Sequence, residues 1–309
     1  MTTRSLPRAS AAAFLLAAAT ACGRDGTRAA APPPAPASGA AAAFTLVYER
    51  EVGGNQDLYL TPAGGVERRL TDDPAGDSLP RFSPDGRRIL FTSERSGNWQ
   101  IWEMPAEGGA ARRVRTNGFR EWQVDEAADG RLAFLSNAEG PECLFVTDRS
   151  GQARRLVRHG EDTIMGNPDW SPDGARIVFS SNHWLGHHIY LVELASGKDR
   201  RLEGRFTRGG CEPRFSPDGR KVTYVSRGHL SDKSRLVEHD LSSGEEKVLV
   251  DWPALNYDPV YSPDGSELAF ASNITGEYVI YRQRLADGRS WRVTFGPGWA
   301  RNPDYRPTR

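Results

Sequence analysis

Three histidines in one short segment are the residues with the most evident capacity for chemistry. His183, His187 and His188 lie within NHWLGHHIY at 182–190 and account for half of the six histidines of the chain. Neutral imidazoles bind divalent transition metals, so His183 and His187 are candidate ligands of one ion. Two further interpretations are a polar loop that contacts a partner and a plain surface loop. No complete ligand set can be counted, because the other histidines are scattered: His159, His229 and His239.

Charged and amide side chains flank a proline that recurs along the chain. Because carboxylates and arginines both occur there, we expect them to pair with one another around a central channel. The alternative is a cation or a small ligand held at the mouth of that channel. The residues one position before the proline, or before its equivalent Val124, are Leu79, Gln123, Asn167, Glu212, Asp258 and Asn302. The residues one position after it are Arg81, Asp125, Asp169, Arg214, Val260 and Asp304.

Tryptophans beside charged residues suggest a contact surface for a protein or a glycan. Packing between repeats is the alternative role for several of these tryptophans. Together with the histidine segment, the candidates for this binding face are Glu121, Trp122, Trp184, Arg208, Glu212, Trp252, Asp258 and Trp299.

These residues are positioned by a repeat of 44 to 46 residues that an aromatic-Ser-Pro-Asp-Gly sequence marks. Clean copies begin at Phe82, Trp170, Phe215 and Tyr261, and a degraded copy, VDEAADG, lies at 124–130. A fixed period of this length indicates one supersecondary unit that is repeated. Pro fixes φ, Asp bonds the following backbone and Gly accepts left-handed geometry, so SPDG is expected to form a structural turn rather than a metal loop or a nucleophile site.

Each repeat also contains short runs rich in β-branched and aromatic residues, as in RRILFTS and WQIWEMP at 87–93 and 99–105. Four such antiparallel strands per repeat, arranged around an axis, form a β-propeller. The chain enters at Phe44 with runs that match second to fourth strands, while WARNPDYRP at 299–307 matches a first strand. We therefore predict an all-β, six-bladed propeller over 44–309, with a C-terminal strand (about 300–307) that closes the ring in the N-terminal blade.

Segments such as FSPDGRRILFTSERSGNWQIWEMPAEGG at 82–109 resemble the repeat of TolB-type propellers. The resemblance extends over about 44–307 and implies the fold rather than the function, because such propellers are binding scaffolds, domains of peptidases and, in a few cases, lyases. TolB itself has an additional N-terminal α/β domain that docks partners of the Tol–Pal envelope machinery, and we expect this chain to lack it. Oligogalacturonate lyases are similar propellers that bind a metal through several histidines.

Motifs of common enzyme classes are absent from the sequence. There is no G-x-S-x-G, HExxH, phosphate-binding or dinucleotide-binding glycine motif. We also expect no hydrolase domain of the prolyl-oligopeptidase kind. The usual propeller geometry places the 182–190 segment on the same face as the connections between repeats, where most propeller binding sites lie.

The first residues have the features of an export signal. The basic stretch MTTRSLPR precedes the apolar run AAAFLLAAATA, which is too short to span a bilayer. The sequence from Ala19 to Cys22 resembles a bacterial lipoprotein box, although Ala stands where Leu is usual. We predict a signal peptide over 1–21, lipidation of Cys22 and an outer-membrane anchor facing the periplasm, with ordinary secretion as the alternative. The Ala- and Pro-rich residues 22–43 are expected to form a tether.

The net charge of the chain is zero, which gives no electrostatic reason to expect a nucleic-acid partner. Cys143 and Cys211 are expected to be unpaired thiols, with a disulfide between them as the alternative. Five Arg-Arg pairs occur at similar positions of the repeats, and we expect them to lie in solvated outer or edge strands. The pairs are at 68–69, 87–88, 112–113, 154–155 and 200–201.

These observations predict a non-catalytic binding scaffold with a monomeric head in the periplasm. Its expected partners are envelope or peptidoglycan-associated proteins that contact the loop face. We expect no cofactor, no nucleic acid, and contact with the membrane only through the lipid anchor. The alternative is a metal-dependent enzyme of the polysaccharide-lyase kind that uses a divalent metal at His183 and His187.

Overall fold

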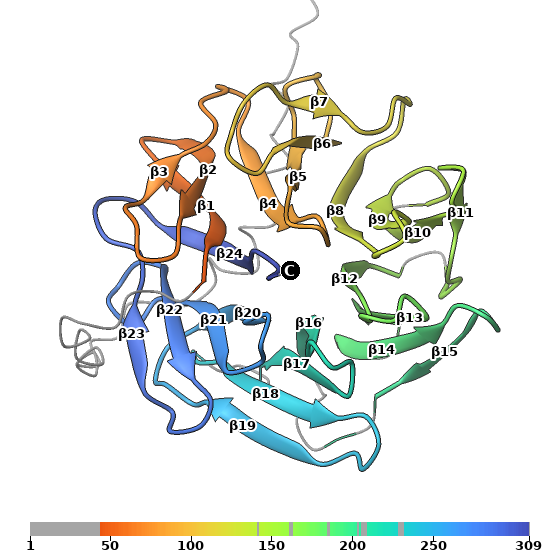
Figure 1. The fold of residues 1–309 in the computed structure, drawn as a ribbon. Coiled ribbons are helices and arrows are strands. Elements are labelled where there is room, and N and C mark those ends of the chain that lie inside the picture. The colour runs from red at the N-terminus through yellow and green to blue at the C-terminus, as the bar shows by residue number, and fades with distance from the viewer. Residues whose placement is uncertain are drawn as a thin grey trace, which may run out of the picture. The chain divides into compact units, whose positions relative to one another are not determined.

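Six four-stranded antiparallel sheets stand in a ring in the computed structural model (Figure 1), and the ring encloses a central channel. The structure describes residues 44–308 except 141, 161–162, 184–185, 203, 205–208 and 228–231. The predicted six-bladed propeller is therefore confirmed. The predicted signal peptide, Cys22 and the tether lie outside the described residues, as do Trp184, Arg208 and His229.

Each blade is a meander whose first strand lines the channel and whose fourth strand lies at the rim (Figure 1). We number the blades in chain order from the one that holds the two ends of the propeller. Blade 1 consists of β24 (Ala300–Tyr305), β1 (Leu46–Val52), β2 (Asn55–Thr61) and β3 (Arg68–Arg69); blade 2 of β4 (Asp77–Phe82), β5 (Arg88–Ser93), β6 (Gln100–Pro105) and β7 (Arg112–Arg113); blade 3 of β8 (Glu121–Glu126), β9 (Leu132–Ser136), β10 (Cys143–Thr147) and β11 (Ala153–Arg155).

The second half of the ring repeats this order without interruption. Blade 4 consists of β12 (Met165–Trp170), β13 (Arg176–Ser181), β14 (His188–Glu193) and β15 (Lys198–Arg201); blade 5 of β16 (Gly210–Phe215), β17 (Lys221–Ser226), β18 (Arg235–Asp240) and β19 (Glu246–Val250); blade 6 of β20 (Asn256–Tyr261), β21 (Glu267–Ser272), β22 (Val279–Arg284) and β23 (Ser290–Arg292).

The C-terminal strand closes the ring. β24 pairs antiparallel with β1, so that Leu46 lies opposite Tyr305 and Arg50 lies opposite Ala300. Both ends of the propeller thus share one sheet, and neither leaves a free inner edge for another chain to pair with. The sequence prediction of this closing strand is confirmed.

The hydrophobic core lies between neighbouring blades. The second strand of a blade has apolar residues on both faces, as in β5, where Leu90 is buried on one face and Ile89 and Phe91 are buried on the other. These two side chains pack with Val47 and Leu58 of blade 1. Because each sheet is covered on both sides by its neighbours, its inner strands consist of continuous apolar runs rather than of strict alternation.

The SPDG sequence forms the predicted turn between the first and second strands. In blade 2, Ser83 Oγ donates a hydrogen bond to Asp85 Oδ1 at 2.6 Å and accepts one from the amide of Arg88 at 3.0 Å. Gly86 has a φ of 66°, in the left-handed region that favours glycine. The motif is therefore structural, as the sequence indicated.

The meander gives the propeller two distinct ends. The SPDG turns and the turns between third and fourth strands lie at one end, the turn face. The connections between blades and those between second and third strands lie at the other, the loop face. Four of the five Arg-Arg pairs lie in fourth strands as expected, but Arg87 and Arg88 lie at the SPDG turn and the start of β5, because the turn there is followed directly by a second strand. No helix that could cross a bilayer occurs in the part of the chain that the structure describes.

Candidate functional site

The channel is lined by two rings of side chains, one on each side of the repeated proline. The turn-side ring contains the residues that follow the proline, and three of its members are aspartates. Each aspartate accepts a hydrogen bond through Oδ2 from the main-chain amide of the aromatic residue in the next blade, at 2.7 to 2.8 Å. The pairs are Asp125 with Trp170, Asp169 with Phe215, and Asp304 with Phe82.

Two arginines of the same ring neutralise most of this charge. Arg214 Nη1 lies 3.2 Å from Asp169 Oδ1 and 3.8 Å from Asp304 Oδ1, and Arg81 Nη1 lies 3.5 and 3.8 Å from the same two oxygens. Burial raises the pKa of Asp125 and of Asp304 to about 6. The expected mutual pairing of carboxylates and arginines is therefore present, and the ring acts mainly as a connection between blades.

The loop-side ring has an unusual backbone. All six of its residues have a positive φ between 51° and 56°, and none is glycine. Each lies in a β-bulge of its channel strand, where the register with the neighbouring strand shifts. Asn and Asp tolerate this conformation better than other non-glycine residues, whereas Leu79 has no polar group to compensate for the strain. The repetition in every blade shows that the bulge belongs to the fold.

Two carboxylates of this ring, those of Glu212 and Asp258, lie against Arg301 where blades 5, 6 and 1 meet. Arg301 donates from Nε to Asp258 Oδ2 at 2.9 Å and from Nη2 to Asp258 Oδ1 at 3.0 Å. It also lies 3.4 Å from Glu212 Oε1. The guanidinium stands 4.8 Å from the ring centroid of Tyr257 and 5.2 Å from that of Tyr278.

Burial favours the protonated form of two carboxyl groups in this cluster, those of Glu212 and Glu49. Burial, reinforced by the neighbouring carboxylate of Asp258, raises the pKa of Glu212 to about 8. Burial also raises the pKa of Glu49, which accepts a hydrogen bond from Asn302 Nδ2 at 2.9 Å. The cluster is therefore a polar, partly protonated group at the loop end of the channel.

The space that remains differs between the ends of the channel. A cavity of about 30 Å³ lies between the two rings, which is room for a water molecule or two. The channel widens toward the turn face into a funnel of about 380 Å³, with walls formed by the SPDG turns and their aromatic residues. Its floor is the turn-side ring.

The described residues of the histidine segment that precede β14 lie on the loop face. His183 is exposed and stacks on the buried ring of His159, with 4.5 Å between the centroids. His159 Nδ1 is hydrogen-bonded to Ser181 Oγ at 3.0 Å, and His159 Nε2 is hydrogen-bonded to Asp199 Oδ2 at 2.8 Å. Burial lowers the pKa of this imidazole. His187 is exposed, whereas His188 is buried at the start of β14. Within the described ranges no three metal-ligating side chains come together.

Other candidates of the binding face are occupied in packing. Glu121 is buried, and its Oε1 accepts hydrogen bonds from Arg115 Nε at 3.2 Å and from Asn117 Nδ2 at 2.7 Å. Trp122 is buried in a core cluster rather than exposed. Trp252 packs edge-on against Phe270 and Tyr281, with centroids 5.1 and 5.0 Å away. Trp299 is half-buried and thus partly available.

Exposed apolar side chains mark the loop face instead. In the described part of the chain five large hydrophobic residues are exposed, and four of them lie in loop-face connections or at their edges. The four are Val52, Phe119, Ile164 and Phe295, exposed by 41, 48, 43 and 61%. The fifth, Val66, lies on the turn face between β2 and β3.

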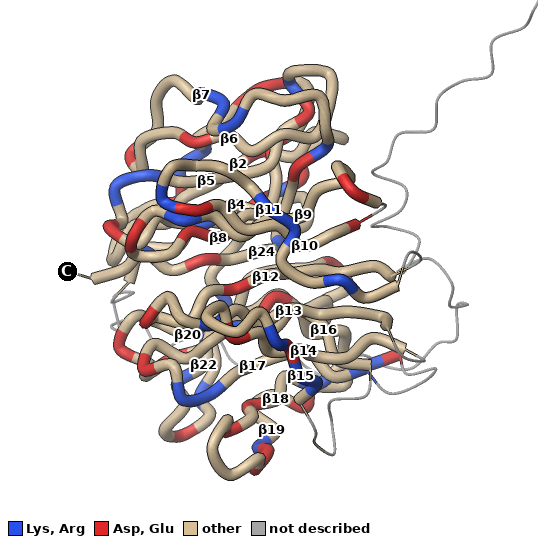
Figure 2. The backbone as a smooth tube through the Cα atoms, turned by 90° about the vertical axis from the view of Figure 1, so that its right-hand side faces the viewer, with Lys and Arg blue, Asp and Glu red and all other residues tan. Residues whose placement is uncertain are grey.

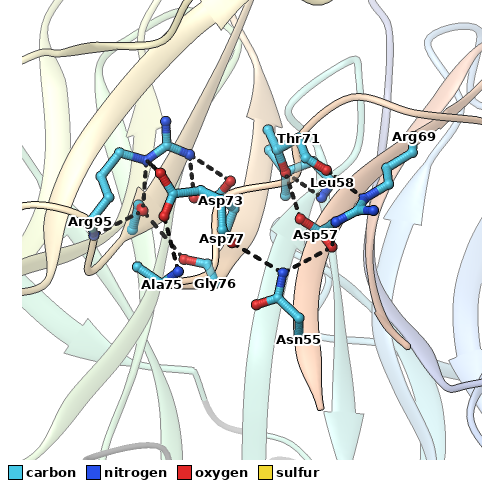
Figure 3. Close-up of polar contacts among 11 residues, drawn as sticks. Asn55, Asp57, Leu58, Arg69, Thr71, Asp73, Ala75, Gly76, Asp77 and Arg95 are labelled. Carbon is cyan, nitrogen blue, oxygen red and sulfur yellow. Dashed lines mark hydrogen bonds and ion pairs between the residues drawn. The ribbon is translucent and has the colours of Figure 1, made fainter. Parts of the chain in front are cut away.

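A further group of carboxylates lies between blades 1 and 2 (Figure 3). Arg95 Nη2 donates to both oxygens of the buried Asp77, at 2.7 and 2.6 Å. Asn55 Nδ2 bridges Asp57 Oδ2 and the carbonyl oxygen of Asp73, at 3.1 and 3.0 Å, and Arg69 Nη2 pairs with Asp57 at 2.6 Å. Each of these carboxylates has a cationic partner, so the group stabilises the junction between the blades.

Comparison with known families agrees with this geometry. The description of the matching family is "TolB beta propeller domain", and the matches extend over residues 28–143 and 126–309. The chain belongs to this family.

Curated relatives of this TolB-type propeller include peptidases. Dipeptidyl-peptidase 5 of Porphyromonas gingivalis is 24% identical over 243 residues, which is 70% of this chain and 33% of that protein. An uncharacterized protein of Agrobacterium fabrum is 31% identical over 135 residues, 40% of this chain and 46% of that protein. The chain thus spans less than half the length of these curated relatives.

Solved structures share the fold at low identity. TolB from Acinetobacter baumannii superposes with a TM-score of 0.74 at 19% identity, over 86% of this chain and 67% of that one. An oligogalacturonate lyase in complex with manganese superposes with a TM-score of 0.51 at 15% identity, over 83% of this chain and 75% of that one. At such identities the likeness shows the fold alone.

Sequence reasoning missed three features of this TolB-type propeller. The left-handed backbone of the loop-side ring had no visible signal, since a residue before proline ordinarily favours an extended conformation. Arg301 is not among the residues that the sequence indicates, although it lies two positions after Trp299, the last tryptophan between blades. Phe119 follows a glycine and Phe295 precedes one, and both lie in connections between blades. An aromatic residue beside a glycine in such a connection is the sequence signal that could indicate these exposed positions.

Proposed function

We propose that this TolB-type propeller is a non-catalytic scaffold whose loop face binds a protein partner. The observation that carries the proposal is the placement of the exposed apolar residues. Large apolar side chains gathered on one face of a protein often mark a site of protein–protein interaction. Phe119 lies between blades 2 and 3, Ile164 between blades 3 and 4, and Phe295 between blades 6 and 1.

The charged cluster beside the channel supplies the polar part of this surface. Glu212, Asp258 and Arg301 lie near the loop end of the channel strands, with Tyr278 against the guanidinium. Buried ion pairs of this kind fix orientation more than they add affinity. A partner would bury the exposed apolar residues Phe119, Ile164 and Phe295, and contacts with this charged cluster would set its orientation on the loop face.

The cell envelope is the proposed location of this interaction. The export signal and the box ending at Cys22 support a periplasmic head with a lipid anchor in the outer membrane. Envelope or peptidoglycan-associated proteins are therefore the proposed partners. In the backbone view of Figure 2, positions of Lys and Arg are interspersed with positions of Asp and Glu along the blades, which supports a mixed apolar and polar contact.

Paired variants on the two faces test this proposal. Phe119→Ser together with Phe295→Ser should lower co-purification of a solubilised envelope partner by about tenfold or more, because apolar anchors carry most of the energy of an interface. Val66→Ser removes an exposed apolar residue from the turn face and should retain the partner. If all three proteins retain the same partners equally, the loop face is not the binding surface.

A metal-dependent lyase is the second candidate function. The stacking of His183 on His159 and the fold shared with an oligogalacturonate lyase favour it. Both nitrogens of His159 are within hydrogen-bonding distance of protein partners, so His183 and His187 would have to hold the ion with ligands beyond His159. This requirement makes the scaffold the better-supported function.

A further inference from the structure

Arginine side chains connect successive blades on the turn face in a recurring way. At three junctions an arginine of one blade donates to the carbonyl oxygen of the SPDG glycine of the next blade, at 2.8 to 3.0 Å. The same guanidinium lies 4.7 to 5.9 Å from the ring centroid of the aromatic residue that precedes SPDG. The pairs of arginine and glycine are Arg306 with Gly86, Arg131 with Gly174, and Arg176 with Gly219.

Two other junctions use an arginine with a different acceptor. Between blades 2 and 3, Arg88 donates to Glu126, which takes the place of the aromatic residue, at 2.8 and 2.9 Å. Between blades 6 and 1, Arg282 donates to the hydroxyl of Tyr305 at 3.2 Å. Five of the six junctions are thus bridged by a guanidinium in the described part of the ring.

The junction between blades 5 and 6 is the exception. The position of Arg176 in blade 4 is held by Lys221 in blade 5, and Lys221 Nζ pairs at 2.8 Å with Glu238 of its own blade. The hydroxyl of Tyr261, the aromatic residue of blade 6, points back to the other oxygen of Glu238 at 2.8 Å. Lys221 therefore pairs within its own blade, and among the described residues the carbonyl oxygen of Gly265 in the neighbouring turn receives no guanidinium donor.

The space beside Gly265 confirms that the position is empty. A Cβ built on Gly174 would meet Arg131 Nη2 at 3.1 Å, and one built on Gly219 would meet Arg176 Nη2 at 3.5 Å. A Cβ built on Gly265 meets only Pro217 Cδ, at 3.9 Å. Among the described residues no guanidinium takes the place beside Gly265.

A groove occupies this junction. Its volume is about 610 Å³, and its walls include the apolar Leu249, Leu285 and Pro217. Its charged groups are the carboxylates of Asp218, Glu238 and Asp264 and the ammonium groups of Lys221 and Lys247, which leaves one negative charge when all are ionised. The groove is larger than a guanidinium group requires, and its apolar walls suit the residues that flank an arginine in a polypeptide.

The geometry points to a second binding site on the turn face, where the groove between blades 5 and 6 accepts an arginine side chain of a partner polypeptide. The guanidinium donates to the carbonyl oxygen of Gly265 and lies beside Tyr261, so the partner completes the bridge that the other junctions build internally. Arginine suits this place better than lysine, because its planar group both stacks on an aromatic ring and donates in two directions. The site is independent of the loop face.

Matched substitutions test the site with a defined probe. The probe is the peptide acetyl-Gly-Ala-Arg-Leu-Gly-amide, titrated into the full-length protein while amide chemical shifts are followed by NMR. Wild type should show saturable shifts at Gly265, and the same peptide with Lys in place of Arg should bind at least about fivefold more weakly. Lys221→Arg should restore the internal bridge, raise Tm by about 2 °C and abolish the shifts.

The converse substitution controls for indirect effects. Arg176→Lys should open an equivalent groove between blades 4 and 5 and create new peptide-dependent shifts at Gly219. Absence of shifts in wild type, equal binding of the lysine peptide, or unchanged binding by Lys221→Arg would each overturn the proposal. Arginine amide alone, if it binds as tightly as the peptide, would overturn the assignment to a polypeptide partner.

Discussion

The carboxylate of Asp304 accepts a hydrogen bond from the main-chain amide of Phe82 at 2.8 Å, although 222 positions separate the two residues. Asp304 belongs to the last strand of the ring and Phe82 to the first strand of blade 2. The contact connects the closing blade to its neighbour in the same way that Asp125 and Asp169 connect later blades. Closure of the ring thus repeats a bond that the interior of the chain already uses.

Loss of this contact should destabilise the propeller. Asp304→Ala leaves the main-chain amide of Phe82 without its acceptor and removes a carboxylate that faces Arg81 and Arg214. We therefore expect the free energy of unfolding to fall by about 1–3 kcal/mol. Asp304→Asn keeps an acceptor oxygen and should cost less. Deleting residues 300–309 removes β24 altogether and should lower Tm sharply. An unchanged Tm for the deletion, measured by calorimetry, would refute the account of closure.

Strain in the loop-side ring should be relieved by a residue that tolerates it. Leu79 has a φ of 56°, a conformation that costs ordinary L-residues about 1–2 kcal/mol. Leu79→Asn should therefore raise the free energy of unfolding by about 1 kcal/mol. Asn167→Leu makes the reverse change at the equivalent position of blade 4 and should lower it. Denaturant titration measures both, and opposite signs from those expected would contradict the strain argument.

Stability should decrease as the pH rises through the range in which Glu212 titrates. Its pKa is raised from 4.5 to about 8 in the folded protein, so between these values the folded state keeps a proton that the unfolded chain releases. The stabilisation is complete below the unfolded value and is lost as the pH rises through about 8. Glu212→Gln removes this titration, and its Tm should fall less than that of wild type between pH 6 and 9. Parallel curves for the two proteins would exclude this role of Glu212.

Metal analysis separates the scaffold from the lyase. The scaffold account expects the purified protein to retain less than stoichiometric zinc or manganese after dialysis, as measured by mass spectrometry of the metals. His183→Ala together with His187→Ala should leave this content unchanged. Stoichiometric metal in wild type that disappears in the double variant would favour the lyase-like enzyme instead.

The fold could be predicted from the sequence because the repeat carries its own chemistry. The SPDG turn, the proline before it and the unmatched segments at the two ends determine six blades and a closing strand. The sites were harder to predict, because a position in a repeat does not reveal its partners. Trp122 and Glu121 lie next to each other in a channel strand, and only the packing of blade 3 shows that both are buried. The lone lysine among the bridging arginines becomes meaningful only when the neighbouring turn is known.

The central claim, binding through the loop face, is tested most directly by site-specific photo-crosslinking in intact cells. A photoreactive amino acid at Phe295 should form an adduct with one envelope protein, whereas the same group at Val66 on the turn face should not capture that protein. Both positions are exposed, by 61 and 84%, so accessibility alone would favour the control. Adducts with the same protein from both positions, or no protein adduct from Phe295, would contradict the account.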